Sequence, residues 1–156
     1  MKLTLALLAL ATTSLLAEAP PLQTDLRKTI SAATKENKMG FILLGRPSCG
    51  NCNATKKMVS EGRIGVTAAE FVMADLNVDD AKTSDDFLKK YGKEKWGNTL
   101  PFVVVTDARG KALASSSGYK NAEQWNALIA EAKAKAGPKG AATPASNWPF
   151  KSPPKQ

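Results

Sequence analysis

The chain has 156 residues, 43% of them hydrophobic, which is enough for one domain with a substantial core but not for two. It contains no histidine, the usual imidazole partner in a copper or zinc site, and its two cysteines fall short of the four ligands of a structural zinc site. We therefore expect no metal and no other cofactor, with metal delivery as a minor alternative. The formal net charge is +8 without any aromatic-basic motif of the kind that recognises bases, so we expect a solvated basic surface and no nucleic-acid binding.

The N-terminus has the pattern of a secretory signal. A positive start precedes an apolar stretch over residues 3–16 and then small residues. The stretch is shorter than the ~20 residues of a membrane-spanning helix, and no cysteine follows it to accept a lipid. We expect a signal over residues 1–17, cut after Ala17 or alternatively after Ala19. This predicts an exported protein, periplasmic or secreted, without stable membrane insertion. An uncleaved N-terminal anchor is the alternative.

The next segments alternate between helix and strand. A helix is predicted over Leu22–Lys38, with Thr24 or Asp25 near its start, because apolar residues recur in it at near-helical spacing. The continuous apolar run Phe41–Leu44 predicts a strand that is buried on both faces. Cys49–Ser60 favours a second helix, so both cysteines are expected on its opening turn, directly after the strand.

The same alternation continues toward the C-terminus. Phe71–Leu76 is predicted as the second strand, and Ser84 as the cap of the helix that follows it. Phe102–Val105 contains strong β-formers and predicts a third strand. The turn signal Asp107–Gly110 indicates that the chain reverses into a fourth strand near residues 111–115, which would make a hairpin.

A last helix is expected to end the folded part. Asn121 is typical of its N-terminal cap, and Trp125 lies in its apolar stripe. Residues 137–156 contain five of the nine prolines, with little to bury, and predict a disordered Pro/Lys-rich tail. In that tail Trp148 and Phe150 either pack back on the domain or bind a partner.

The two cysteines, Cys49 and Cys52, are separated by two residues. As a purely structural disulfide this pair would close a loop of only about four residues. Such a disulfide stabilises the fold by roughly 2 kcal/mol, against ~3 kcal/mol for one that closes a 15-residue loop. A redox dithiol explains the spacing better. Unpaired N–H groups and the helix dipole stabilise a thiolate at a helix start, which predicts Cys49 as the exposed nucleophile and Cys52 as the buried resolving thiol. Arg46 either points inward and adds to this effect or is an exposed arginine without a catalytic role.

This order of elements, with CxxC at a helix start and a proline before the third strand, resembles the thioredoxin family over residues 22–136. The residues that carry the likeness are Cys49-Gly50-Asn51-Cys52, Ala74-Asp75-Leu76-Asn77-Val78-Asp79, Tyr91-Gly92, Leu100-Pro101 and Gly118. The resemblance implies an α/β thioredoxin fold, with a central four-stranded mixed sheet flanked by helices, in one domain over residues 22–136.

The resemblance also implies the rest of the site. Pro101 should be a cis proline beside the dithiol, where Leu100 offers main-chain hydrogen bonds to a substrate peptide. Ser48 stands where the family usually has tryptophan, which makes the surroundings of the nucleophile more polar. Leu43 stands where thioredoxins often bury an aspartate. We therefore hypothesise that Asp75, on the neighbouring strand, accepts the proton of the buried cysteine. The alternative is that Asp75 faces solvent or caps a turn.

The resemblance implies a thiol:disulfide oxidoreductase with a redox-active Cys49–Cys52 disulfide. Gly50-Asn51 between the cysteines supplies no cation to stabilise the thiolate strongly, which disfavours a powerful oxidase. We expect an exported monomer that reduces protein disulfides and receives electrons from a membrane thiol transporter. The alternatives are a disulfide isomerase or oxidase, and a non-catalytic thioredoxin-fold binding module.

Overall fold

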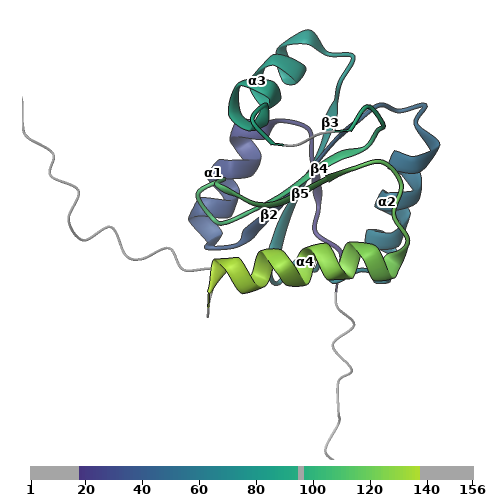
Figure 1. Cartoon of the computed structure of the whole chain (residues 1–156). Helices are drawn as coiled ribbons and strands as arrows, with labels where there is room; N and C mark the ends of the chain where they lie inside the picture. Colours follow the sequence, from purple (N-terminus) through teal and green to yellow (C-terminus); the bar gives the residue numbers. More distant parts are fainter. Residues whose placement is uncertain (1–17, 95–96, 138–156) are drawn as a thin grey trace, which may run out of the picture.

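The computed structural model describes residues 18–94 and 97–137 (Figure 1). The predicted signal over residues 1–17 and, beyond Gly137, the predicted tail with its two aromatic residues lie outside these described residues. None of the helices in the described ranges combines the length and the apolar character that crossing a membrane requires.

A mixed sheet of five strands forms the middle layer of the described chain. Its strands are β1 (Leu22–Gln23), β2 (Met39–Gly45), β3 (Phe71–Asn77), β4 (Phe102–Thr106) and β5 (Ala112–Ser117). Their order is β1-β3-β2-β4-β5, in which β1 and β2 run parallel to β3, β4 runs antiparallel to β2, and β5 runs antiparallel to β4. The predicted mixed sheet and hairpin are confirmed. β2 is buried along its whole length, as its apolar run predicts.

Two predictions are wrong near residue 22. The sheet has five strands rather than four, and the first helix does not begin at Leu22. Residues 22–23 instead form a fifth strand at the edge of the sheet, paired with β3. Leu22 is 52% exposed whereas Leu26 is buried, so their helical spacing does not reflect one buried helix face. The helix begins after Asp25, whose backbone is extended and whose carboxylate caps the first turn.

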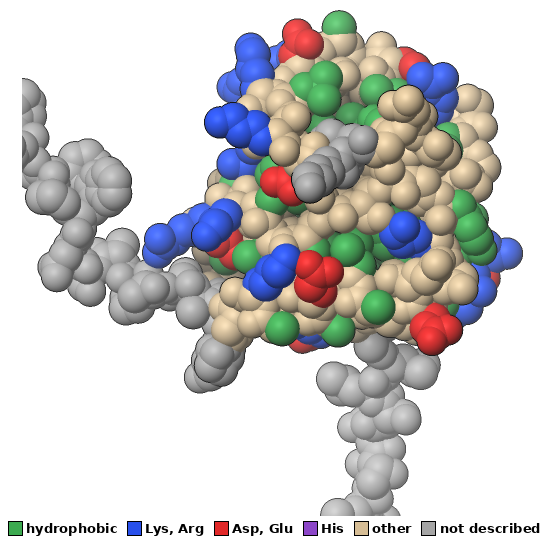
Figure 2. All heavy atoms as spheres, viewed as in Figure 1, with side chains coloured by type: hydrophobic (Ala, Val, Ile, Leu, Met, Phe, Trp, Pro, Cys, Tyr) green, Lys and Arg blue, Asp and Glu red, His purple; other side chains and the backbone are tan. Residues whose placement is uncertain are grey.

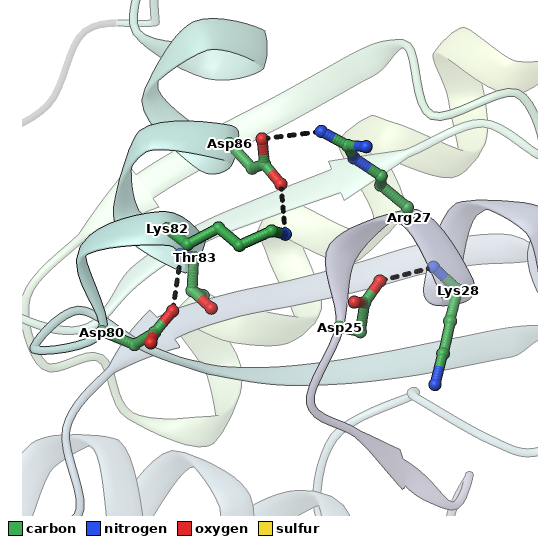
Figure 3. A network of polar contacts seen from close by, with 7 residues as sticks. All are labelled: Asp25, Arg27, Lys28, Asp80, Lys82, Thr83 and Asp86. Atoms are coloured by element: carbon green, nitrogen blue, oxygen red, sulfur yellow. Dashed lines mark hydrogen bonds and ion pairs between the residues drawn. The ribbon is translucent and has the colours of Figure 1, made fainter.

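Four helices flank the sheet in the described chain, and each is preceded by a capping side chain. They are α1 (Leu26–Glu36), α2 (Gly50–Ser60), α3 (Ala81–Tyr91) and α4 (Ala122–Ala136). Cys49 caps α2, and Asn121 caps α4 in a reciprocal capping box. The prediction of Ser84 as the cap of α3 is wrong. Asp80 caps this helix, because its carboxylate accepts a 2.7 Å hydrogen bond from the backbone N–H of Thr83 (Figure 3).

The helices cover the two faces of the sheet (Figure 1), and each face is buried in its own apolar layer. On the face covered by α2 and α4, Phe41 and Leu43 of β2 pack with Cys52 and Trp125. On the face covered by α1 and α3, the intervening Ile42 belongs to the second layer. Successive side chains of a strand point to opposite faces, so one strand supplies both layers. The cysteine pair therefore belongs to the α2/α4 side of the molecule.

Candidate active site

Cys49 and Cys52 form a disulfide at the first turn of α2. Cys49 is the N-cap residue, and its Sγ accepts a 3.1 Å hydrogen bond from the backbone N–H of Cys52. The side chain of Cys49 is partly exposed, whereas Cys52 is 0% exposed and belongs to the apolar core. The sulfur predicted as the nucleophile is therefore the one that solvent reaches, and the predicted resolving sulfur lies beneath it.

The end of β2 is shaped to admit the buried sulfur. A Cβ atom on Gly45, the last residue of the strand, would lie 2.6 Å from the Sγ of Cys52, closer than any side chain tolerates. After the strand, the side-chain amide of Asn53 donates a 3.0 Å hydrogen bond to the carbonyl of Pro47 and ties the loop to the helix. The absence of a side chain at position 45 thus allows the disulfide to pack directly against the sheet.

A second loop meets the site from a distant part of the sequence. The peptide bond between Leu100 and Pro101 is cis, as the resemblance implied, and Pro101 is buried. The backbone N–H of Gly118 lies within hydrogen-bond distance of two carbonyls, those of Thr99 at 2.8 Å and Pro101 at 3.0 Å. Leu100 packs on the apolar cluster that contains the buried cysteine and against which the exposed cysteine also lies. The structure therefore brings the predicted Leu100-Pro101 segment to the same cluster as the disulfide.

Asp75 lies on β3 beside Leu43 of β2, on the sheet side covered by α2. Its side chain is 26% exposed, and its Oδ2 lies 2.8 Å from the Nζ of Lys56, which is 21% exposed. Lys56 follows Cys52 by four residues on α2, so it shares that face of the helix. The carboxylate therefore faces the helix that carries the disulfide and forms an ion pair there. Its proton-accepting role stays a prediction.

Lys56 is not among the residues that the sequence predicts for this site. The signal was its spacing of four residues from Cys52, which places both on one helical face. Gly45 is not among them either, although a glycine that ends a buried strand just before a cysteine pair indicates a close approach of another group. Lys56 contacts Asp75 and Gly45 lies against Cys52, and both contacts form only when α2 packs on the sheet.

Arg46 and Lys56 line a small cavity of about 230 Å³ beside the disulfide loop, together with Pro47 and Asp75. The guanidinium of Arg46 lies 3.1 Å from the carboxylate of Asp79 and is about half exposed. Each cation at this cavity therefore has a carboxylate partner. Within residues 18–94 and 97–137, no group of three His, Cys, Asp or Glu side chains is arranged to hold a metal ion.

The comparisons with known proteins find likeness in structure only. No family model matches the sequence, and no curated protein matches it either. Among solved structures, an uncharacterised thioredoxin-like protein from Clostridium perfringens is 17% identical, with a TM-score of 0.52, over 79% of this chain and 90% of that one. A single-residue mutant of a thioredoxin from Halobacterium salinarum is 15% identical, with a TM-score of 0.52, over 75% and 94%. A putative disulphide isomerase from Bacteroides thetaiotaomicron is 17% identical, with a TM-score of 0.51, over 74% and 94%.

Proposed function

We propose that this chain, which has the thioredoxin fold, is a thiol:disulfide oxidoreductase that acts on other proteins through Cys49 and Cys52. One observation carries the proposal. Two linked sulfurs sit at the start of a helix, one partly exposed and one fully buried. In such a pair the exposed sulfur can form a mixed disulfide with a sulfur of another protein, and the buried sulfur can then break that mixed disulfide.

In the reducing direction the cycle starts from the dithiol. The thiolate of Cys49 attacks one sulfur of a substrate disulfide, the substrate S–S bond breaks, and the departing substrate sulfur takes up a proton. Cys52, after losing its own proton, attacks the Sγ of Cys49 and releases the second substrate sulfur as a thiol. The substrate gains two electrons and two protons, and the protein is left with the Cys49–Cys52 disulfide.

Three features of the chain support this chemistry. The backbone N–H of Cys52 points at the Sγ of Cys49, and the positive end of the helix dipole lies at the same place, so both favour negative charge on that sulfur. The Leu100-Pro101 loop lies against the same apolar cluster and is proposed to hold an extended substrate by its main chain. The carboxylate of Asp75 faces α2, where it pairs with Lys56, and it is proposed to accept the proton that Cys52 loses.

We further propose that the protein is exported, acts as a monomer and works as a reductase. Gly50-Asn51 carries no cation to stabilise a reduced form strongly, which argues against a strong oxidant. An exported reductase needs electrons from elsewhere, and a membrane thiol transporter is the proposed donor. Isomerisation of protein disulfides is the second candidate, since one of the similar folds is described as a putative disulphide isomerase.

Insulin reduction in the presence of dithiothreitol tests the proposal. The wild type should accelerate precipitation of the insulin chains, and Cys49→Ser should fall to the uncatalysed rate because it lacks the attacking sulfur. Cys52→Ser, reduced and then freed of dithiothreitol before insulin is added, should keep the first step and accumulate a covalent complex with the substrate, visible on a non-reducing gel. A wild type with no activity, or a Cys49→Ser variant as active as the wild type, would reject catalysis by this pair and favour the non-catalytic binding module.

A further inference from the structure

A second hollow lies on the opposite side of the sheet from the disulfide. It is a groove of about 550 Å³ between α1 and α3, here called the α1–α3 groove. Its floor and rim are formed chiefly by Leu26, Arg27, Ile30, Asp86, Lys89 and Lys90. Because α2 and α4 cover the opposite face of the sheet (Figure 1), a molecule bound in this groove would leave Cys49 accessible.

The floor of the α1–α3 groove is apolar and continuous with the core. Leu26 is buried in the same layer as Phe87 of α3, and Ile30 is partly buried against that layer. A side chain laid on this floor would meet hydrocarbon that is already held in place by the sheet. The floor therefore supplies a preformed contact for one apolar side chain.

The rim has one carboxylate, and that carboxylate is already engaged by two cations. Asp86 of α3 lies 3.2 Å from the Nζ of Lys82 and 3.0 Å from the guanidinium of Arg27, which reaches across from α1 (Figure 3). The hydrogen bond from Lys82, which has the larger effect, and the one from Arg27 lower the pKa of Asp86 below its ordinary value of 3.8. Asp86 therefore stays ionised at neutral pH, and its single negative charge is shared between two positive ones.

The remaining charges on the rim are positive. Within the described residues no Asp or Glu lies within ion-pair distance of Lys89 or Lys90, and the neighbouring Asp85 forms no such pair. Lys90 lies 5.6 Å from the ring centre of Tyr91, which leaves its charge in place. The side chain of Arg27 is 75% exposed. Lys and Arg side chains gather over the side of the molecule formed by α1 and α3 (Figure 2).

We propose that the α1–α3 groove binds an acidic amphipathic segment of a partner protein, with an apolar side chain on Leu26 and Ile30 and flanking carboxylates on Arg27, Lys89 and Lys90. Arginine pairs with carboxylates through two parallel N–H donors, and lysine adds a mobile positive charge. The occupant lies across an apolar floor between cations, which matches the pattern of acidic-motif recognition at basic grooves.

The charge and openness of the groove favour a segment of a partner protein over the chain's own C-terminal residues, a second copy of the chain or a small ligand. The chain's own residues 138–156 contain lysines and no Asp or Glu, so a cationic rim repels rather than attracts them. A second copy of a chain with net charge +8 is repelled in the same way. A small ligand is usually enclosed over most of its surface, whereas Lys89 and Lys90 are exposed to solvent. A segment that passes through an open groove fits these features.

The test uses a short fluorescein-labelled peptide in which glutamates flank a Leu-Leu pair, with fluorescence anisotropy as the readout. The double variant Lys89→Gln/Lys90→Gln should bind it roughly tenfold more weakly than the wild type, since each rim cation contributes modestly. The matched control Lys57→Gln/Lys135→Gln removes the same charge from α2 and α4 and should bind as the wild type does. Equal loss in both variants would overturn the proposal, because it would show attraction to net charge alone.

Peptide variants and a dithiol variant complete the test. Replacing the two leucines by serine should weaken binding as much as removing the rim lysines does, because the apolar floor is then unused. Binding that survives this change would overturn the proposed role of Leu26 and Ile30. Cys49→Ser should bind the peptide as the wild type does, even if insulin reduction fails. Loss of binding in Cys49→Ser would place the peptide at the disulfide, and binding of anionic vesicles with none of the peptide would assign the groove to lipid. Either result would overturn the proposal.

Discussion

Lys56 brings a positive charge to the face of α2 that also carries Cys52, one helical turn away. Its ammonium lies 2.8 Å from the carboxylate of Asp75, so at the scale of single residues Asp75 has two possible roles. As a proton acceptor it would ionise the resolving cysteine. As a counter-ion it would neutralise Lys56 and keep that positive charge from stabilising thiolates. The two roles predict opposite effects of removing the carboxylate.

We expect Asp75→Asn to slow disulfide exchange by at least about tenfold near pH 7, the lower part of the range for a lost general base. The rate should approach that of the wild type at higher pH, where Cys52 ionises without help. Lys56→Gln keeps the carboxylate and should retain most of the wild-type rate. Stopped-flow measurement of insulin or glutathione disulfide reduction across pH provides the check.

The fold should survive both substitutions, since a partly exposed ion pair contributes only about 0.2–1 kcal/mol. Lys57→Gln, on the exposed side of α2, is the matched control for altered helix charge. If the pH–rate profile of Asp75→Asn equals that of the wild type, the proton-accepting role is rejected. A faster rate in that variant would instead assign Asp75 the counter-ion role.

At the scale of elements, the start of each helix is decided by one short side chain rather than by the apolar stripe. Leu22 has the spacing of a helix residue but lies in β1, because the extended backbone of Asp25 separates it from α1. At α3, Asp80 rather than Ser84 caps the helix, so the first turn lies earlier than the hydroxyl suggested. A capping carboxylate is the earliest acceptor that the unpaired N–H groups can reach.

Replacing the cap of α1 should lower stability in a pH-dependent manner. Asp25→Ala loses the hydrogen bond that the backbone N–H of Lys28 donates to the carboxylate, and we expect a loss of about 1 kcal/mol in unfolding free energy. The same hydrogen bond is the main reason that the pKa of Asp25 lies below its ordinary value of 3.8. A depressed pKa stabilises the fold above about pH 4 and loses that contribution as the carboxylate is protonated at lower pH.

Asp25→Asn keeps a capping oxygen without the titration and separates the two effects. It should remain close to the wild type at neutral pH and lose less stability than the wild type when the pH falls from about 5 to about 2. Urea unfolding followed by circular dichroism at neutral and acidic pH measures this difference. Equal stability of Asp25→Ala and Asp25→Asn at neutral pH would contradict the capping role.

At the scale of the whole molecule, the sheet lies between the two proposed sites. The disulfide, the Leu100-Pro101 loop and Asp75 lie with the α2/α4 layer, whereas the α1–α3 groove lies on the other face. A partner held in the groove does not block the exposed sulfur of Cys49. The proposed docking site and the proposed catalytic site can therefore be occupied together.

The reduction potential of the disulfide is a property of the whole fold and decides the direction of the reaction. With no cation between the cysteines, we expect a value near that of thioredoxin, about −270 mV, rather than that of a strong oxidant, about −120 mV. Equilibration of the purified protein with glutathione buffers, followed by alkylation and mass spectrometry, gives this value. A potential near the oxidant end would reverse the proposed direction.

Much of the fold follows from local patterns. The apolar run Phe41–Leu44 predicts a buried central strand because a strand with helices on both sides has no polar face. The spacing of Cys49 and Cys52 after that strand predicts the disulfide at a helix start, which the structure confirms. The family resemblance supplied the cis bond before Pro101, which no local pattern predicts.

What the sequence by itself determined is therefore the four longer strands, the four helices and the placement of both sulfurs at the start of one helix, since these depend on neighbours within a few residues, whereas the edge strand β1 was missed. Only the tertiary structure decided that Lys56 faces Asp75, that Gly45 makes room for Cys52, and that cations of α1 and α3 share one groove. Those contacts join residues on different elements, and their distances depend on how the helices dock on the sheet. Residue spacing along the chain does not specify that docking.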